Sequence, residues 1–508
     1  MIARLCRSKL AWFSFTILFL SCLVVAQEAR QAASADPLSE DRLMADMHGI
    51  SSHTLLDYVK EMASPKYKGR LTGTPEFDAI AQWTADLMAG WKIKPAGDKG
   101  SFYQKFSNPY TLVFPGGSLS LDIKLANGEI VKRPYVFEEE YFPGSTSDSG
   151  TITAEVVYVS YGATAPELGY DDYAGIDVKG KLVMMEPEVP VTPDRDPELF
   201  KKWRPYSFHD YKVQNAAKHG AAGVVYNYFI VNPNCAFVKG FGWAAASRAV
   251  WDDVFAGTGK KRDDVLKQIR STLKPASFAT GKVMTMKNVT EHHPEGIGAN
   301  VVGFIEGTDP VLKQEAIVIG AHLDHLGLNP VLMPGAHDNA SGVAVLLSAA
   351  EALATSGIPF KRSIVFVAFG AEEQGVKGSE FYVAHPFMPN EKTKAMLNLE
   401  SVGRGESISA GSGRNFPQLW EVIDRLNKKY IHRSVTASAN SNLARPRQDA
   451  AHFLWANVPT ISFGTGGSKP LPYATYHTSK DSPDIITPEI MEDLARLLFL
   501  TTVELATK

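Results

Sequence analysis

The stretch from Glu315 to Gly342, EAIVIGAHLDHLGLNPVLMPGAHDNASG, constrains the fold more than any other part of the chain. Ala316 to Ile319 is a short apolar run of the kind found in strands that are buried on both faces. His322 and Asp324 come directly after this run. Because open α/β sheets place their sites at the carboxyl ends of strands, we expect both side chains at that edge of a sheet.

Asp338 is a third ligand-type residue, in the Gly-rich turn that follows. The next segment, SGVAVLLSAAEALATSG, has helical periodicity and predicts a helix closed by Gly357. A single His or Asp in a loop is most often a solvated polar residue. One imidazole and two carboxylates in the loop after one strand instead indicate a metal site.

The chain after this stretch repeats the pattern of a strand followed by polar side chains. Residues 363–369 form a second predicted buried strand, and Glu372 and Glu373 stand just beyond its carboxyl end. Two adjacent acids suit a division of labour, with one on metal and one acting as a base. Glu400 ends the next predicted strand, and His477 follows a Gly/Pro-rich loop ahead of a last amphipathic helix, 488–506. Seven ligand-type side chains, from His322 to His477, therefore follow successive strands, which favours one shared site.

The first 26 residues carry Arg4, Arg7 and Lys9 and then an apolar run to Ala26, which is the pattern of a secretory signal. We expect an extracytoplasmic protein, periplasmic or secreted, without stable membrane association after cleavage. An uncleaved anchor and a lipoprotein processed at Cys22 are the alternatives, and the Phe19-Leu20-Ser21 sequence before that cysteine matches a lipoprotein box weakly.

Composition and cysteine content fit a secreted enzyme. The 508 residues are enough for two or three domains, and the net charge of −3 gives no indication of nucleic-acid binding. Two of the three cysteines lie in the signal, so Cys235 alone remains and we expect no internal disulfide.

The middle of the chain is β-rich and has no cluster of ligand-type residues. We predict an inserted domain at 131–292, between an N-terminal part of the main α/β domain at 27–130 and its larger part at 293–508. The segment from Trp243 to Ile269 is expected to form a pair of surface helices. The insert is expected to shape access to the site and to be dispensable for metal binding.

These motifs resemble the M28 family of zinc peptidases, the co-catalytic aminopeptidases and their relatives. The resemblance covers roughly Lys68 to Leu505 and is carried by AHLDH, DNASG, AEEQGVKGS, NLE and YHTSKDS, in the family's order. It implies an α/β fold with a mixed central sheet flanked by helices, of the zinc exopeptidase, phosphorylase/hydrolase-like type. The segments YDDYAGIDVKGKLVMM and AAKHGAAGVVYN make the insert similar to a protease-associated (PA) domain.

Transferred residue by residue, the resemblance implies two zinc ions. His322 and Glu400 would bind one ion, Glu373 and His477 the other, and Asp338 would bridge them. Glu372 would be the general base, and Asp324 would hydrogen-bond His322. Zinc takes imidazole and carboxylate ligands, and two zinc ions that share a carboxylate can activate one water between them.

The chain departs from the usual family pattern at three places. Glu400 stands where Asp is commoner, so its metal geometry is open. His337 and His325 lie close to the ligands, and each is interpreted as a polar residue behind the ligands, with an accessory ligand as the alternative. The segment Gln448 to Phe453 differs from the family's SDH followed by an aromatic residue.

The function implied by the resemblance is removal of N-terminal residues from peptide substrates. Tyr473 and Tyr476 are the candidates to line the pocket for the first side chain. A carboxypeptidase, with Arg404, Arg445 or Arg447 facing the terminal carboxylate, and a glutaminyl cyclase-like enzyme remain alternatives on the same fold. A metal-free peptide- or protein-binding member is a third, which the complete ligand set disfavours. The sequence does not predict an oligomeric state.

Overall fold

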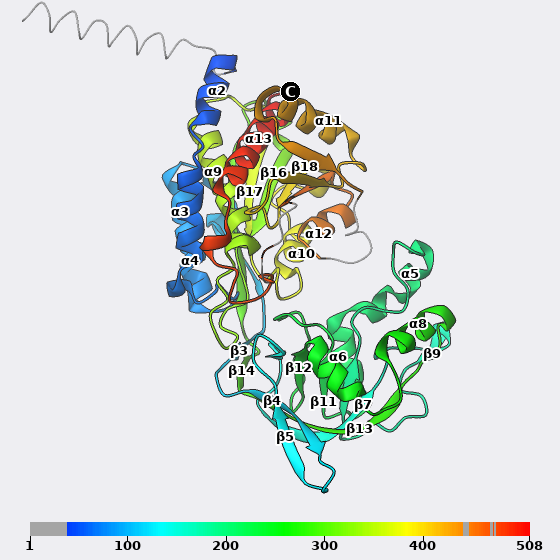
Figure 1. The fold of residues 1–508 in the computed structure, drawn as a ribbon. Helices are drawn as coiled ribbons and strands as arrows, with labels where there is room; N and C mark the ends of the chain where they lie inside the picture. Colours follow the sequence, from blue (N-terminus) through cyan, green and yellow to red (C-terminus); the bar gives the residue numbers. More distant parts are fainter. Residues whose placement is uncertain (1–37, 440–446, 468–470, 472–473) are drawn as a thin grey trace, which may run out of the picture.

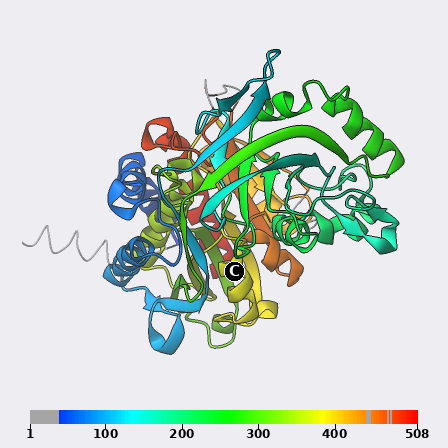
Figure 2. The ribbon, with the colours of Figure 1, turned by 90° about the horizontal axis from the view of Figure 1, so that it is seen from below.

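Two separate β-sheets organise the chain in the computed structural model, which describes residues 38–439, 447–467, 471 and 474–508 (Figure 1). One sheet and its helices form the upper part of Figure 1, and the second sheet forms the lower part, drawn in cyan to green. Seen from below, strands of the second sheet cross in front of the first part (Figure 2).

The first sheet has nine strands in the order β1-β15-β17-β16-β18-β21-β19-β20, with β2 also paired to β15. Its centre, from β17 to β21, is parallel, whereas β15 and β19 join in antiparallel fashion. The expected mixed sheet is therefore confirmed. The strands are β1 (Lys94–Pro95), β2 (Tyr103–Ser107), β15 (Ile297–Ile305), β16 (Ala316–His322), β17 (Ser363–Phe369), β18 (Thr393–Leu399), β19 (Ser407–Gly411), β20 (Ser434–Ala437) and β21 (Thr460–Gly466).

Strands β16 and β17 are buried at every position, as the apolar runs predicted. Helices cover both faces of the sheet, so neither face can be polar. The core on one face contains side chains of α3, α4, α9, α11 and α13, and the core on the other contains those of α10 and α12. The helices of this part are α2 (Glu40–His48), α3 (Ser52–Met62), α4 (Pro75–Gly90), α9 (Ser341–Thr355), α10 (Lys377–Ala384), α11 (Pro417–Leu426), α12 (Ala450–Trp455) and α13 (Pro488–Thr507).

The second sheet has eight strands in the order β5-β4-β13-β7-β10-β11-β12-β6. Its strands are β4 (Ser118–Lys124), β5 (Ile130–Pro134), β6 (Tyr141–Pro143), β7 (Gly150–Tyr158), β10 (Leu182–Met185), β11 (Gly223–Tyr226), β12 (Gly242–Ala246) and β13 (Phe278–Asn288). Its helices are α5 (Pro197–Trp203), α6 (His209–Lys218), α7 (Arg248–Phe255) and α8 (Arg262–Thr272). Apolar side chains pack on both faces of this sheet and give it a core of its own.

The chain enters and leaves the second part through paired strands. β3 (Tyr110–Val113) lies antiparallel to β14 (Thr290–His293), and these two short strands lie between the two parts (Figure 1). The second sheet therefore starts at β4, earlier than the expected domain start at residue 131. The predicted boundary at residue 131 falls inside β5, the antiparallel partner of β4.

The expectation of surface helices over Trp243 to Ile269 is wrong for its first residues. Trp243 is 1% exposed and lies in β12, a parallel strand of the second sheet whose five residues are all buried. The two helices, α7 and α8, begin only afterwards, and Val250, Trp251 and Ile269 of these helices are also buried. The large apolar side chains in this segment fill the core of the second part.

Candidate metal centre

The ends of three neighbouring parallel strands bring the predicted residues together. His322 is the last residue of β16 and is paired in register with Phe369, the last residue of β17. Glu372 and Glu373 follow β17, and Glu400 follows β18, the other parallel neighbour of β16. Because parallel strands end at one edge, these side chains reach the same space, as the sequence predicted.

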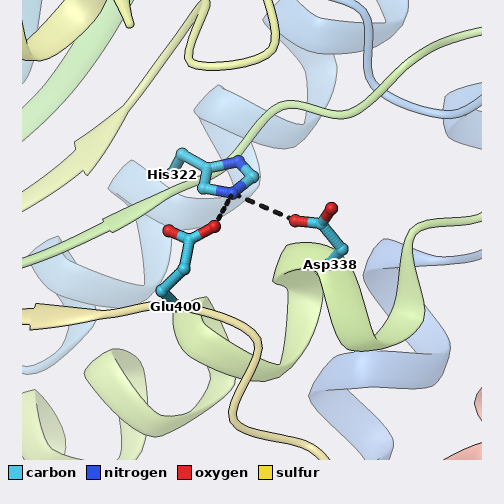
Figure 3. A group of neighbouring side chains, drawn as sticks. All are labelled: His322, Asp338 and Glu400. Carbon is cyan, nitrogen blue, oxygen red and sulfur yellow. Dashed lines mark ion pairs between the residues drawn. The ribbon is translucent and has the colours of Figure 1, made fainter. Parts of the chain in front are cut away.

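The first group of ligand atoms centres on His322, which is fully buried. Its Nε2 atom lies 3.2 Å from Oδ1 of Asp338 and 3.4 Å from Oε1 of Glu400. Figure 3 shows both carboxylates approaching the same ring nitrogen. Glu400, where an Asp was the commoner residue, therefore reaches the group with its longer side chain.

The second group centres on His477. Its Nε2 atom lies 3.3 Å from Oδ2 of Asp338 and 3.0 Å from Oε2 of Glu373. The two oxygens of Asp338 thus face different imidazoles, one in each group. This placement is what a bridging carboxylate requires.

His325 is a third buried imidazole at this site. Its Nδ1 atom lies 2.7 Å from Oε1 of Glu373, so that His325 and His477 approach the two different oxygens of this carboxylate. His325 also falls within a compact cluster of ligand atoms with Asp338 and Glu373. The hydrogen-bond distance between His325 and Glu373 supports the interpretation of His325 as a residue that orients a ligand.

The unpaired polar atoms at this site fit a bound cation. Nε2 of His322 and His477, Oδ1 of Asp338 and Oε2 of Glu400 are all buried and have no hydrogen-bond partner among the described residues. Buried polar atoms are normally paired, so convergent unpaired nitrogen and oxygen atoms are unusual unless a metal satisfies them. Imidazole and carboxylate together are typical ligands of zinc.

Glu372 lies beside both groups without belonging to either cluster of ligand atoms. Burial raises the pKa of its carboxyl group well above the usual value, and the charges of Glu400 and Glu373 act in the same direction. By contrast, the pKa of Glu373 is lowered to about 2, because His477 and a hydrogen bond from His325 outweigh the effect of burial. Two adjacent carboxyl groups therefore have very different proton affinities, as a base and a ligand would require.

Asp324 is placed differently from the expectation that it hydrogen-bonds His322. Its carboxylate lies 3.6 Å from Nδ1 of His322, and that nitrogen instead lies 3.2 Å from the backbone carbonyl of Asp324. The two carboxylate oxygens accept the backbone amides of Glu372, at 3.2 Å, and Glu373, at 3.3 Å. Asp324 therefore fixes the segment that carries the two glutamates.

Sequence reasoning missed Arg70, which is fully buried against the segments that carry His322 and Asp338. Its guanidinium donates to the backbone carbonyls of Leu323, at 3.0 Å, Pro334, at 2.7 Å, and Gly335, at 2.9 Å. Burial lowers its pKa to about 10, an effect that the charges of Asp324 and nearby acids oppose. The only sequence signal is a basic residue in the turn Lys68 to Thr74, which is common on protein surfaces.

The expected substrate residues are only partly described. Tyr476 is stacked on His477, with ring centroids 3.9 Å apart, and both line a cavity of about 110 Å³ together with Glu372 and Arg447. Arg404 does not line this cavity, and its guanidinium donates to Thr475 at 3.4 Å. Tyr473 and Arg445 lie outside the described residues.

The fold and the site define a class: a metallopeptidase with a mixed α/β sheet that carries its ligands at the carboxyl edge. Within that class, residues 300–502 match the model of peptidase family M28.

Two curated relatives are named aminopeptidases. The sequence is 26% identical to aminopeptidase YwaD of Bacillus subtilis over 256 residues, which is 48% of this chain and 51% of that protein. It is 26% identical to an aminopeptidase of Pseudomonas aeruginosa over 430 residues, 81% of this chain and 69% of that protein. The chain thus spans about half of the first relative and somewhat more of the second.

Solved structures share the fold over nearly the whole chain. An aminopeptidase from Aneurinibacillus sp. strain AM-1 superposes with a TM-score of 0.61, at 20% identity, over 91% of this chain and 95% of that one. A zinc aminopeptidase from Bacillus subtilis gives the same TM-score and identity, over 90% and 96% of the two chains. The likeness therefore includes the second sheet.

Proposed function

We propose that this protein is an extracytoplasmic dizinc aminopeptidase that releases N-terminal residues from peptides. The observation that carries the proposal is the position of Asp338, whose two oxygens face His322 in one group and His477 in the other. One carboxylate between two ligand groups, with the buried carboxyl group of Glu372 beside it, supports peptide hydrolysis by a bridging water. The names of the relatives support the aminopeptidase direction.

In this proposal His322 and Glu400 bind one zinc, Glu373 and His477 bind the other, and Asp338 is shared. When bound, zinc polarises the scissile carbonyl and lowers the pKa of water to about 7. The protein's own residues then have to orient the ligands and move a proton.

Glu372 is the group that accepts this proton and passes it to the leaving amine. Its backbone amide is held by Asp324, and its carboxyl group is buried beside the ligands. Burial favours the neutral form of a carboxyl group, so that a carboxylate here accepts a proton more strongly than one in water. The cationic centre would draw its pKa down from the value it has without metal.

Whether the enzyme cleaves from the amino or the carboxyl terminus depends on the charges that surround the bound end of the peptide. An N-terminal ammonium needs acids, and Glu372 and Glu400 are the candidates. Arg447 lines the same cavity, which keeps the carboxypeptidase alternative open; its guanidinium lies 3.1 Å from Glu188 and is paired with that acid. Tyr476, and by expectation Tyr473, would contact the first side chain.

Peptides blocked at one end test the direction. We expect C-terminally amidated peptides to be trimmed from the N-terminus and N-acetylated ones to resist, with products identified by mass spectrometry. The opposite pattern would assign carboxypeptidase activity, with Arg447 as the residue that faces the terminal carboxylate. Conversion of N-terminal glutamine to pyroglutamate would indicate a cyclase, and binding of either peptide without turnover would indicate an inactive member.

The wider organisation is also proposed. We assign residues 1–26 to a cleaved secretory signal; they lie outside the described residues. We assign the second sheet to a PA-like inserted domain, within the peptidase domain formed by the segments on either side. Among the described residues, no helix combines the length and apolar character needed to cross a membrane.

A further inference from the structure

His477 receives its orientation from the inserted part of the chain. Its Nδ1 atom lies 2.7 Å from the backbone carbonyl of Val231, a residue beyond β11 in the second part. A carbonyl oxygen only accepts hydrogen bonds, so Nδ1 of His477 carries the proton. The other nitrogen, Nε2, is then the one left free to bind metal, and it faces Asp338 and Glu373.

A second loop of the insert contacts the same segment. The carboxylate of Glu138, between β5 and β6, accepts the backbone amide of Ser479 at 2.7 Å. Ser479 is two residues beyond His477, so the insert contacts this ligand loop at the ligand itself and just after it.

The Val231 loop is fixed locally. Val231 is fully buried in the core of the insert, and the next residue, Asn232, is 5% exposed. The side-chain oxygen of Asn232 accepts the backbone amide of Asn234 at 2.8 Å, which holds the chain in a tight turn directly after Val231. Asn232 and Asn234 also line the cavity beside Glu373 and His477.

We infer that the insert is an integral part of the metal centre: the carbonyl of Val231 is a positioning group for His477, and metal binding at the Glu373/His477 site depends on this contact. The inference rests on the proposed dizinc function. It replaces the expectation that the insert is dispensable for metal binding. Hydrogen-bond partners behind a ligand typically contribute 10- to 100-fold to metal affinity, because they fix the tautomer and the ring direction.

The site that does not depend on the insert provides an internal reference. Nδ1 of His322 lies at hydrogen-bond distance from the backbone carbonyl of Asp324, which belongs to the main domain. A loosened insert should therefore weaken one metal equivalent and leave the other near its original affinity. General destabilisation of the protein would weaken both.

The test measures zinc affinity in two variants of the insert. Asn232→Ala removes the side-chain acceptor of the turn after Val231, and Glu138→Ala removes the second contact at a part-buried position. Asn127→Ala is the matched control, since Asn127 holds the same type of turn, with Glu129 at 2.9 Å, in the exposed β4–β5 hairpin. Each protein is equilibrated against a chelator-buffered zinc series, and bound zinc is counted by mass spectrometry of the metal.

We expect wild type and Asn127→Ala to bind two equivalents, and Asn232→Ala to weaken one of them about 10- to 100-fold. Glu138→Ala should weaken the same equivalent by less, and Glu138→Gln, which keeps an acceptor oxygen, should restore it. Unchanged affinity in both alanine variants, or equal weakening of both equivalents, would overturn the inference. Fewer than two equivalents in wild type would instead overturn the dizinc proposal.

Discussion

The carboxylate of Asp481 accepts the backbone amide of Asp338 through one oxygen, at 3.0 Å, and that of His337 through the other, at 2.8 Å. The backbone carbonyl of Asp481 also accepts the amide of Ala336 at 3.0 Å. The loop after His477 therefore determines where the proposed bridging carboxylate stands. Residues distant in sequence are joined here because a buried backbone amide must be paired.

Asp481→Asn should weaken zinc binding. An amide has one acceptor oxygen, so its NH₂ group would face a backbone N–H and leave it unpaired. We expect about 10-fold lower zinc affinity, the low end of the effect of such partners, measured by chelator competition. Asp484→Asn, at an exposed position in the same segment, should bind zinc as wild type does. Unchanged affinity in Asp481→Asn would show that the Asp338 loop is held by other contacts.

Glu372→Gln should retain metal and lose turnover. The substitution removes a proton acceptor while keeping size and leaving the proposed ligands in place, and general-base contributions are typically about 10²–10⁴-fold. The measurement is kcat on an unblocked peptide alongside the zinc content. Glu380→Gln, on the exposed side of α10, is the control. A variant with near wild-type kcat would assign the base to another residue.

Arg70→Met should destabilise the protein strongly. It leaves the carbonyls of Leu323, Pro334, Gly335 and Met62 without their buried donor. Each lost buried hydrogen bond costs about 1–3 kcal/mol, so we expect a loss of at least about 3 kcal/mol in the free energy of unfolding, measured by urea titration. Arg248→Met, at a largely exposed arginine of α7, should change it by less than about 0.5 kcal/mol. An Arg70→Met protein as stable as this control would contradict the interpretation.

The raised pKa of Asp172 predicts that the stability of the insert depends on pH. Burial raises its pKa to about 7, although it accepts the backbone amides of Tyr161, at 3.1 Å, and Ala163, at 3.0 Å. An acid whose pKa is raised on folding contributes stability that is present below its unfolded pKa, about 4, and is lost as the pH rises through about 7.

The slope from one such proton is at most about 1.4 kcal/mol per pH unit. Urea unfolding of wild type and Asp172→Asn at a series of pH values from 5 to 8 should show the difference between the two proteins narrowing or reversing in favour of Asn as the pH rises. Parallel curves over this range would mean that Asp172 is ionised throughout.

The sequence alone determined the strands and the candidate ligands at their ends. Strands buried on both faces favour continuous apolar runs, and imidazole and carboxylate are typical zinc ligands. The strands Ala316–His322 and Ser363–Phe369 and the candidate residues His322, Glu372 and Glu373 were therefore visible in the residue order. A polar residue directly after a buried strand has few other places to go than the edge of the sheet.

Only the tertiary structure decided which groups hold those ligands in place. Arg70, the Asp481 carboxylate and the Val231 carbonyl act across long sequence separations, and two of these three contacts use backbone atoms of the partner. The Val231 carbonyl is itself a backbone atom, which every residue possesses, so no residue type marks it. Periodicity and motif spacing report local geometry, whereas these hydrogen bonds exist only after the insert and the sheet have packed together.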